Sequence, residues 1–360
     1  MDMKRTLPVL LKYLAVVAVS CLLAFAISQS PALAQDAAVA PKVGSGILPA
    51  DYASPGAYKI EFAVATWRDA ARDRDIPVKI YFPATTGANG DATKFPAIVF
   101  SHGLGGNREG GKKWTQHWAS HGFVVVALQH PGSDDALWKG TNPGDFANNM
   151  KSGATMKSLG LRVGDVHFAI DEIIRRTNTG ERAFANVDAK RIGMSGHSFG
   201  AQTTLAVSGQ KAPSIGGQSG LDLRVTAAIA LSPNARNKNN PTRQFGDIKV
   251  PFFSITGSED RSILGDGTTV EHRRMPYEYM PAGKKYLAVF DGGDHMVFGG
   301  HELGKRRPET ARDRKIQEGV MAGTLAFWNA ELKQDAAARS WLAQGGYRAT
   351  LADKDVFEHK

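Results

Sequence analysis

The stretch RIGMSGHSFGAQT, residues 191–203, places Ser198 between Gly196 and Gly200 directly after a short apolar run. The run is typical of a β-strand, and the small and apolar residues behind the serine are typical of a helix. Glycine at both flanking positions lets the strand and helix backbones approach closely around a tight turn. Because such a turn exposes the hydroxyl, the stretch predicts Ser198 as a nucleophile. Gly-x-Ser-x-Gly is weak evidence in a chain with 39 glycines, so the rest of the sequence has to supply the partners.

The regions around this stretch predict an α/β fold. Two early segments alternate apolar and polar residues, as half-buried antiparallel strands do: YKIEFAVATW at 58–67 and IPVKIYFPA at 76–84. Later apolar runs are continuous and alternate with helical stretches, which favours a parallel sheet with helices on both faces. These runs are FPAIVFSHG at 95–103, FVVVALQHPG at 123–132, RVTAAIALSP at 224–233, VPFFSITGSED at 250–260 and KKYLAVFDGGDH at 284–295. We therefore expect a mostly parallel central sheet with an antiparallel N-terminal start.

The N-terminal residues have the pattern of a secretory signal peptide. Lys4 and Arg5 precede an apolar stretch at 13–27, and residues 32–34 supply the small residues of a cleavage site. Cleavage after Ala34 predicts a secreted or periplasmic protein. An uncleaved membrane anchor is the alternative that the pattern leaves open.

Beyond this leader the sequence predicts one domain. Residues 35–56 read as a linker, residues 57–349 as a single domain, and residues 350–360 as a C-terminal tail. The chain's one cysteine, Cys21, lies inside the leader, so no disulfide framework is expected. Stability then depends on a large hydrophobic core.

The formal net charge of +9 is spread along the chain. Its short cationic groups lack the interleaved aromatic residues of a nucleic-acid surface: Lys112-Lys113, Arg175-Arg176 and Lys305-Arg306-Arg307. We therefore expect no nucleic-acid partner, and at most a weak association with the anionic surfaces of a cell envelope.

One histidine pair has the spacing of metal ligands. His117 and His121 stand four residues apart on a predicted helix, but the residues between them lack the glutamate of the zinc-protease motif. No third ligand follows nearby in the sequence. We expect neither a metal nor a cofactor.

A serine nucleophile needs a histidine base and a carboxylate that orients it, in the chain order serine, acid, histidine for this kind of fold. Asp260 and Glu259 both follow an apolar strand at its carboxyl end, and we favour Asp260 because of its spacing after Gly257. Of the ten histidines, His295 follows a late strand with glycines that let its loop fold back over the turn.

Neighbouring residues offer less suitable alternatives. Asp294 adjoins the base and is expected to point elsewhere, and His301 reads as a loop histidine. His197, beside the nucleophile, is expected to pack beneath the turn.

Attack on a carbonyl creates an oxyanion that backbone N–H groups must stabilise. Phe199 follows the serine and supplies one N–H, and Leu104 in SHGLGG supplies the second after the FPAIVF strand. Trp138 and Met296 are expected to give the substrate cleft apolar walls. The segment 133–160, which carries Trp138, is either a partial lid or an ordinary surface excursion.

Four motifs together resemble those of a known family: FSHGLGGN at 100–107, ASHGFVVVALQHPGSD at 119–134, GHSFG at 196–200 and GGDH at 292–295. They resemble the α/β-hydrolases grouped with bacterial dienelactone hydrolases and platelet-activating-factor acetylhydrolases. The likeness covers roughly residues 75–300. It implies an α/β-hydrolase fold and ester hydrolysis without a cofactor, and it supports the roles of Ser198, His295, Leu104 and Phe199.

The chain also departs from parts of that group. Plasma platelet-activating-factor enzymes place their acid after the sixth strand, where this chain reads ALSPN at 230–234 without a carboxylate. Dienelactone hydrolases proper use a cysteine nucleophile. An acid at Asp260 is similar to that of secreted bacterial polyester hydrolases of cutinase type, which commonly carry a disulfide that is absent here.

The sequence thus predicts a serine carboxylesterase acting on short to medium acyl esters through an acyl-enzyme. A phospholipid acetylhydrolase or lipase, a cutinase-like polyester hydrolase and a peptidase remain alternatives among enzymes. The alternative outside enzymes is a catalytically silent binding module on a hydrolase fold.

Overall fold

The computed structural model describes residues 52–84, 93–211, 220–235, 239–262, 265, 267–301, 303 and 307–360. The predicted signal peptide over 1–34, its cysteine and most of the predicted linker lie outside the described residues.

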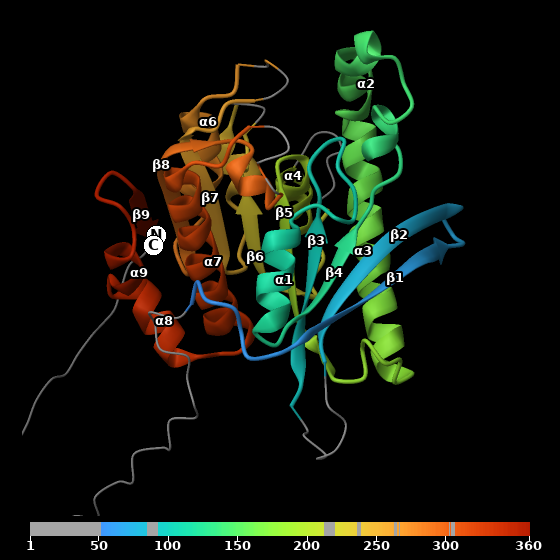
Figure 1. Ribbon diagram of the computed structural model, residues 1–360, viewed down its shortest axis with the longest axis horizontal. Helices are drawn as coiled ribbons and strands as arrows, with labels where there is room; N and C mark the ends of the chain where they lie inside the picture. The colour runs from blue at the N-terminus through green and yellow to red at the C-terminus, as the bar shows by residue number, and fades with distance from the viewer. Residues whose placement is uncertain are drawn as a thin grey trace, which may run out of the picture. The chain divides into compact units, whose positions relative to one another are not determined.

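The described strands form one nine-stranded sheet in the order β1-β2-β4-β3-β5-β6-β7-β8-β9 (Figure 1). The first pairings, β1 with β2 and β2 with β4, are antiparallel, and the pairings from β4 through β8 are parallel. The strands are β1 Ile60–Asp69, β2 Arg74–Pro83, β3 Phe95–Ser101, β4 Val124–Leu128, β5 Val187–His197, β6 Val225–Leu231, β7 Phe252–Glu259, β8 Lys285–Asp294 and β9 Val356–His359. The predicted α/β-hydrolase fold, a mostly parallel sheet with an antiparallel start, is confirmed.

Helices cover both faces of the sheet because the central strands are apolar on both sides. In β3, Ile98 and Phe100 join one buried cluster and Ala97 and Val99 join another, as the two-residue period of a strand requires. Side chains of α1 (Lys112–Ser120) and α7 (Ala311–Leu332) belong to the first cluster. Those of α3 (Met156–Asn178) and α4 (Phe199–Val207) belong to the second.

The remaining helices extend these layers. They are α2 Phe146–Gly153, α5 Pro241–Phe245, α6 Val270–Tyr279, α8 Ala336–Ala343 and α9 Gly346–Ala349, with 3₁₀ turns at Asp135–Leu137, Pro143–Asp145 and Val297–Gly299. Buried residues of α5 and the end of α6 pack with α4 in a third cluster.

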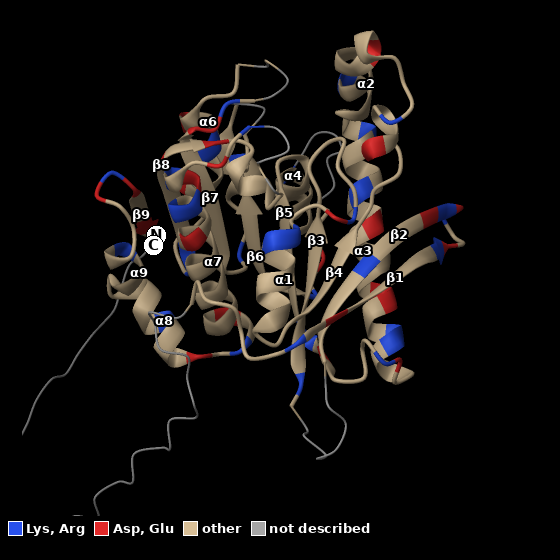
Figure 2. Cartoon of the chain, viewed as in Figure 1, with Lys and Arg blue, Asp and Glu red and all other residues tan. Residues whose placement is uncertain are grey.

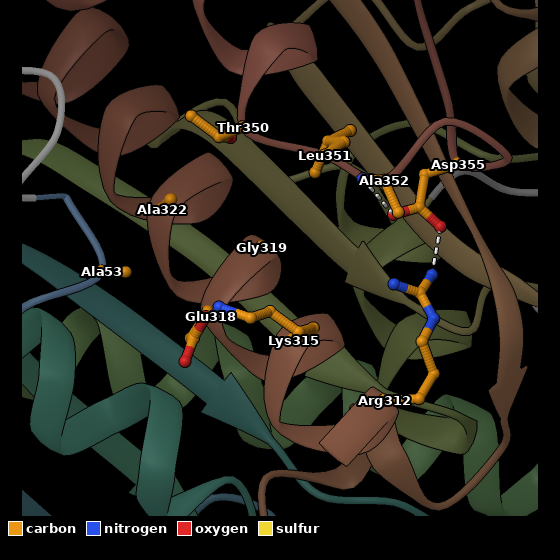
Figure 3. Close-up of a pocket in the computed structure, with 10 residues that line it drawn as sticks. All are labelled: Ala53, Arg312, Lys315, Glu318, Gly319, Ala322, Thr350, Leu351, Ala352 and Asp355. Atoms are coloured by element: carbon orange, nitrogen blue, oxygen red, sulfur yellow. Dashed lines mark hydrogen bonds and ion pairs between the residues drawn. The ribbon is translucent and has the colours of Figure 1, made fainter.

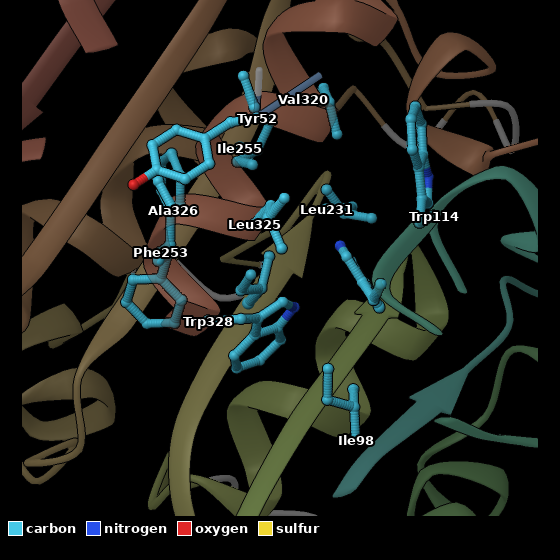
Figure 4. Packing of buried hydrophobic residues seen from close by; sticks show 14 of the residues in the cluster. Tyr52, Ile98, Trp114, Leu231, Phe253, Ile255, Val320, Leu325, Ala326 and Trp328 are labelled. Carbon is cyan, nitrogen blue, oxygen red and sulfur yellow. The ribbon is translucent and has the colours of Figure 1, made fainter. Parts of the chain in front are cut away.

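Large aromatic side chains fill the layer between the sheet and α1 and α7 (Figure 4). The rings of Trp118 and Trp328 meet edge to face at 5.8 Å, and the Trp118 indole N–H donates to Thr324 Oγ1. Each buried aromatic side chain removes a large apolar area from water. This large hydrophobic cluster stabilises a domain that has no cysteine in its described part.

Both ends of the described chain join this core. Tyr52, inside the predicted linker, is only 2% exposed and packs on the Trp341 ring at 4.8 Å. The sequence predicts a tail over 350–360, yet β9 pairs antiparallel with β8 there, with Tyr286 opposite His359. Strand β9 has two apolar and two polar residues and is too short to show a strand pattern in the sequence.

Cationic and anionic residues are interspersed over the helices and strands (Figure 2). Many are paired: on α3, for example, Glu172 binds both Arg175 and Arg176. None of the described helices is long and apolar enough to cross a membrane.

Candidate active site

The turn between β5 and α4 holds Ser198 in a strained backbone conformation, with φ 58° and ψ −114°. A non-glycine residue adopts positive φ at a cost in free energy, and such strain is common at functional turns. Gly196 and Gly200 lie on either side. A Cβ on Gly196 would lie 2.5 Å from the Gly200 carbonyl carbon, and a Cβ on Gly200 would overlap the Ser101 carbonyl oxygen. Only glycine fits at these two positions.

The Gly200→Ala substitution is expected to lower the free energy of unfolding by about 3 kcal/mol or more, because β3 and α4 must separate to admit the methyl group. Gly160→Ala on α3 is the matched control, since a Cβ there meets nothing within 4 Å. It is expected to stabilise the protein by about 0.5–1 kcal/mol through helix propensity. Urea unfolding of the two variants measures both effects, and equal stabilities would contradict the close approach.

Three side chains from distant parts of the chain form a hydrogen-bonded row at this turn. The His295 Nε2 atom lies 2.9 Å from Ser198 Oγ, and His295 Nδ1 lies 2.7 Å from Asp260 Oδ1. Ser198 lies between β5 and α4, Asp260 follows β7 and His295 follows β8. The parallel strands β5, β7 and β8 have their carboxyl ends at one edge of the sheet, which brings these residues together.

Asp260 is fully buried and held from several sides. Thr256 Oγ1 donates to its Oδ2 at 2.7 Å, and the buried Arg273 guanidinium lies 3.2 Å from its Oδ1. Burial raises the pKa of Asp260, but the hydrogen bond from His295 and the charge of Arg273 outweigh it and hold that pKa below its usual value. The carboxylate is therefore ionised and oriented toward His295.

The alternative carboxylates lie elsewhere. The Glu259 side chain is 56% exposed and lies 3.7 Å from Arg261. Asp294 accepts the backbone N–H groups of Met296 and Val297 at 3.0 and 2.9 Å, and it pairs with Arg307. Asp294 thus fixes the turn that follows His295.

The alternative histidines also have separate places. His197 is buried, and its Nε2 donates to the His295 carbonyl oxygen at 3.0 Å. Burial and the nearby His295 lower the pKa of His197 well below its usual value, so its ring is neutral. His301 lies exposed beyond the turn. Of these histidines, His295 is the one bonded to Ser198.

The loop after β3 approaches the serine closely. A Cβ on Gly103 would lie 3.5 Å from the Ser198 Cβ. Leu104 is the next residue, so its backbone N–H belongs to the peptide that joins it to Gly103. Gly105 N–H donates to the Ser133 carbonyl at 3.0 Å. Phe199 is the first residue of α4, at the helix end where the dipole favours negative charge.

The segment 133–160 packs against this loop. Trp138 donates its indole N–H to the Gly105 carbonyl at 2.7 Å and is 39% exposed. Helix α2 projects at the upper right of Figure 1 and exposes Phe146, while its Met150 is buried. Met296 is partly buried against the aromatic core. A lid function of this segment and substrate contacts by Trp138 and Met296 remain predictions.

The two histidines with metal-ligand spacing are hydrogen-bonded to the segment that precedes β1. His117 Nε2 bonds to the Tyr52 carbonyl and His121 Nε2 to the Ser54 carbonyl, both at 2.9 Å. Within the described ranges, no three His, Cys, Asp or Glu side chains are grouped closely enough to hold a metal ion.

A cavity of about 420 Å³ lies between α7 and the segment that leads into β9 (Figure 3). Arg312 and Asp355 form an ion pair at its wall, and Gly319 and Ala322 line it from α7. None of its lining residues belongs to the Ser198, His295 and Asp260 row.

Sequence reasoning did not single out two buried arginines near the site. Arg273 on α6 is 3% exposed and Arg162 on α3 is fully buried. Arg273 stands among polar residues in the sequence, and its neighbour Arg274 is part of a surface network with Glu278. One signal for the burial of Arg162 was available in the sequence. Val163 and Val166 face the sheet, and Arg162 lies on the same face of the helix, four residues before Val166.

Part of the chain is similar to known proteins named as cutinases and acetylhydrolases. A family model described as platelet-activating factor acetylhydrolase, isoform II, matches residues 75–140. The chain is 26% identical to Cutinase 2 of Thermobifida cellulosilytica over 61% of its own length and 64% of the cutinase. It is also 26% identical to Cutinase cut1 of Thermobifida fusca, over 61% of its own length and 53% of that protein.

A further relative is the platelet-activating factor acetylhydrolase of Canis lupus familiaris, 28% identical over 31% of each chain. The chain thus spans between 53% and 64% of the length of these two cutinases and a smaller part of the acetylhydrolase.

Proposed function

We propose that this chain, a member of the α/β-hydrolase superfamily, is a serine carboxylic-ester hydrolase that works through an acyl-enzyme. The observation that carries the proposal is the hydrogen-bonded row of Ser198, His295 and Asp260 at the strained turn. A serine hydroxyl, a histidine base and a buried carboxylate in this order are the parts that nucleophilic acyl transfer requires.

The proposed reaction begins with attack of Ser198 Oγ on the ester carbonyl carbon. His295 Nε2, 2.9 Å away, takes the serine proton, and His295 Nδ1–H donates to Asp260 throughout. The protonated imidazole then gives its proton to the leaving alcohol as the ester bond breaks. A water molecule, deprotonated by the same Nε2, releases the acid and restores Ser198.

The negative charge on the carbonyl oxygen needs donors that are in place before the reaction starts. We assign this role to the backbone N–H groups of Phe199 and Leu104. The position of Phe199 at the start of α4 and the approach of Gly103 to Ser198 support the assignment.

For the substrate we propose short to medium acyl esters. Trp138, tied to the Gly105 carbonyl, and the partly buried Met296 supply apolar surface beside the turn. The relatives named cutinase favour a polyester substrate as the second candidate, and those named acetylhydrolase favour an acetylated phospholipid.

The proposal is tested with the purified protein, p-nitrophenyl acetate, butyrate and octanoate, and a fluorophosphonate label located by mass spectrometry. We expect hydrolysis that is fastest with acetate or butyrate, and label on Ser198. Parallel assays on an aliphatic polyester film and on an acetylated phospholipid distinguish the two further substrate classes. Equal rates across the three chain lengths would contradict the proposed acyl preference.

An inert wild-type protein would support the other class of function, a binding module on a hydrolase fold. In that case the fluorophosphonate would leave Ser198 unmodified and none of the esters would be hydrolysed. The location of the protein, secreted or periplasmic, stays a proposal from the pattern of residues 1–34.

A further inference from the structure

A buried arginine lies behind the loop that follows β3. Arg162 on α3 is fully buried, and its Nη1 donates to the His102 carbonyl at 2.6 Å while its Nη2 lies 3.4 Å from the Gly103 carbonyl oxygen. Its guanidinium also stacks 4.4 Å from the centre of the Phe199 ring. One cation therefore contacts the two segments that carry Leu104 and Phe199.

His102 holds the same loop from a second direction. The backbone N–H of His130 donates to His102 Nε2 at 3.1 Å, so the proton of the neutral ring resides on Nδ1. That Nδ1–H donates to the Gly103 carbonyl at 2.6 Å. Burial, with the charge of Arg162, lowers the pKa of His102 well below its usual value and keeps the ring in this neutral form.

The Gly103 carbonyl is thus surrounded by donors. Besides His102 Nδ1 and Arg162 Nη2, the Gly106 N–H donates to it at 3.1 Å. A trans peptide unit is planar, with its C=O and N–H pointing in opposite directions. Donors that hold the Gly103 oxygen on one side of the loop therefore direct the Leu104 N–H to the other side.

A buried carboxylate, Asp165, lies close enough for its charge to favour the charged form of Arg162. Asp165, one turn further along α3, is fully buried and binds Arg72, Arg74 and His130. Burying a guanidinium costs free energy that an apolar side chain of similar volume would not incur. An arginine whose donors go to His102, Gly103 and Ser133 suits a positioning role better than simple packing.

We propose that Arg162 and His102 are positioning residues that orient the Gly103–Leu104 peptide and seat Phe199, so that both backbone N–H groups face the developing oxyanion. The inference rests on the proposed ester hydrolysis and extends it to residues that touch neither substrate nor Ser198. Their effect is confined to the transition state, because the oxyanion exists only there.

Two substitutions of His102 separate its two hydrogen bonds. His102→Gln keeps an acceptor for the His130 N–H but removes the donor to Gly103, whereas His102→Asn keeps a donor near the Nδ1 position. We expect His102→Gln to lower kcat for p-nitrophenyl butyrate by about 100-fold with KM unchanged. His102→Asn is expected to retain kcat within about fivefold of wild type.

Arg162→Lys tests the second residue, since it keeps the charge and removes the planar fork of donors. We expect kcat to fall by about 100-fold, and inhibition by an alkyl boronic acid, which mimics the tetrahedral intermediate, to weaken by the same factor. Arg176→Lys is the matched control: Arg176 is also on α3 and also stacks on an aromatic ring, Trp67 at 4.8 Å. It is expected to leave kcat and boronic acid binding unchanged.

The outcomes are distinguishable. If wild type hydrolyses esters but Arg162→Lys and His102→Gln match it in kcat and boronic acid binding, the positioning role is wrong. Equal losses in His102→Gln and His102→Asn, in step with a lowered Tm, would also overturn it, because that is the result of a structural role. If Arg162→Lys fails to fold, the comparison of His102→Gln with His102→Asn tests the proposal, because both variants keep the arginine. A wild type inert toward all esters would refute the proposed function instead.

Discussion

The Ser198→Ala variant is expected to lose about 10⁶-fold in kcat for p-nitrophenyl butyrate, the largest effect of any single substitution in this protein. Ser198 Oγ is the atom that bonds to the acyl group, and its hydrogen bond to His295 is the path of the proton. Without that oxygen no acyl-enzyme forms, and His295 has no hydroxyl to activate. Steady-state kinetics and loss of fluorophosphonate labelling measure the effect.

A buried serine on the same helix provides the control. Ser208 lies at the C-terminal end of α4 and is 1% exposed, far along the helix from the turn. Ser208→Ala is expected to keep kcat within about twofold, as substitutions away from the reacting groups do. Residual activity of Ser198→Ala near that of the control would mean that another residue is the nucleophile.

Asp260→Asn is expected to lower kcat by about 10⁴-fold. The carboxylate accepts a hydrogen bond from His295 Nδ1–H at 2.7 Å, which leaves Nε2 free to take the proton of Ser198. An asparagine amide can donate instead, which favours the wrong imidazole tautomer and no longer stabilises the imidazolium. The kcat of the variant, measured beside its Tm, separates this effect from unfolding.

The measurement of Tm matters because the substitution also removes the ion pair with buried Arg273. Glu259→Gln is the matched control, since Glu259 is the adjacent carboxylate and is largely exposed. It is expected to keep kcat and Tm near wild type. A larger loss of kcat in Glu259→Gln than in Asp260→Asn would assign the acid to Glu259.

The pattern of the central strands was readable from sequence because it is local. Alternation in β1 and the continuous apolar run of β3 reflect whether one or both sides of a strand are buried. Strand β2 also alternates in sequence, yet it is buried along most of its length. The strand β9 was not foreseen, because four residues at the edge of a sheet need little hydrophobic pattern. Its place depends on pairing with β8.

The sequence by itself determined the α/β fold and the candidate nucleophile, because glycine spacing and hydrophobic period are imposed by the backbone of each element. The tertiary structure alone decided which of two adjacent carboxylates meets His295, since Asp260 turns inward and Glu259 outward from the same strand end. It also decided that Arg162 lies beside Phe199 and the Gly103 carbonyl. Such contacts join residues far apart in the chain. No local sequence pattern determines which groups the charged end of a long side chain contacts once the helices have packed.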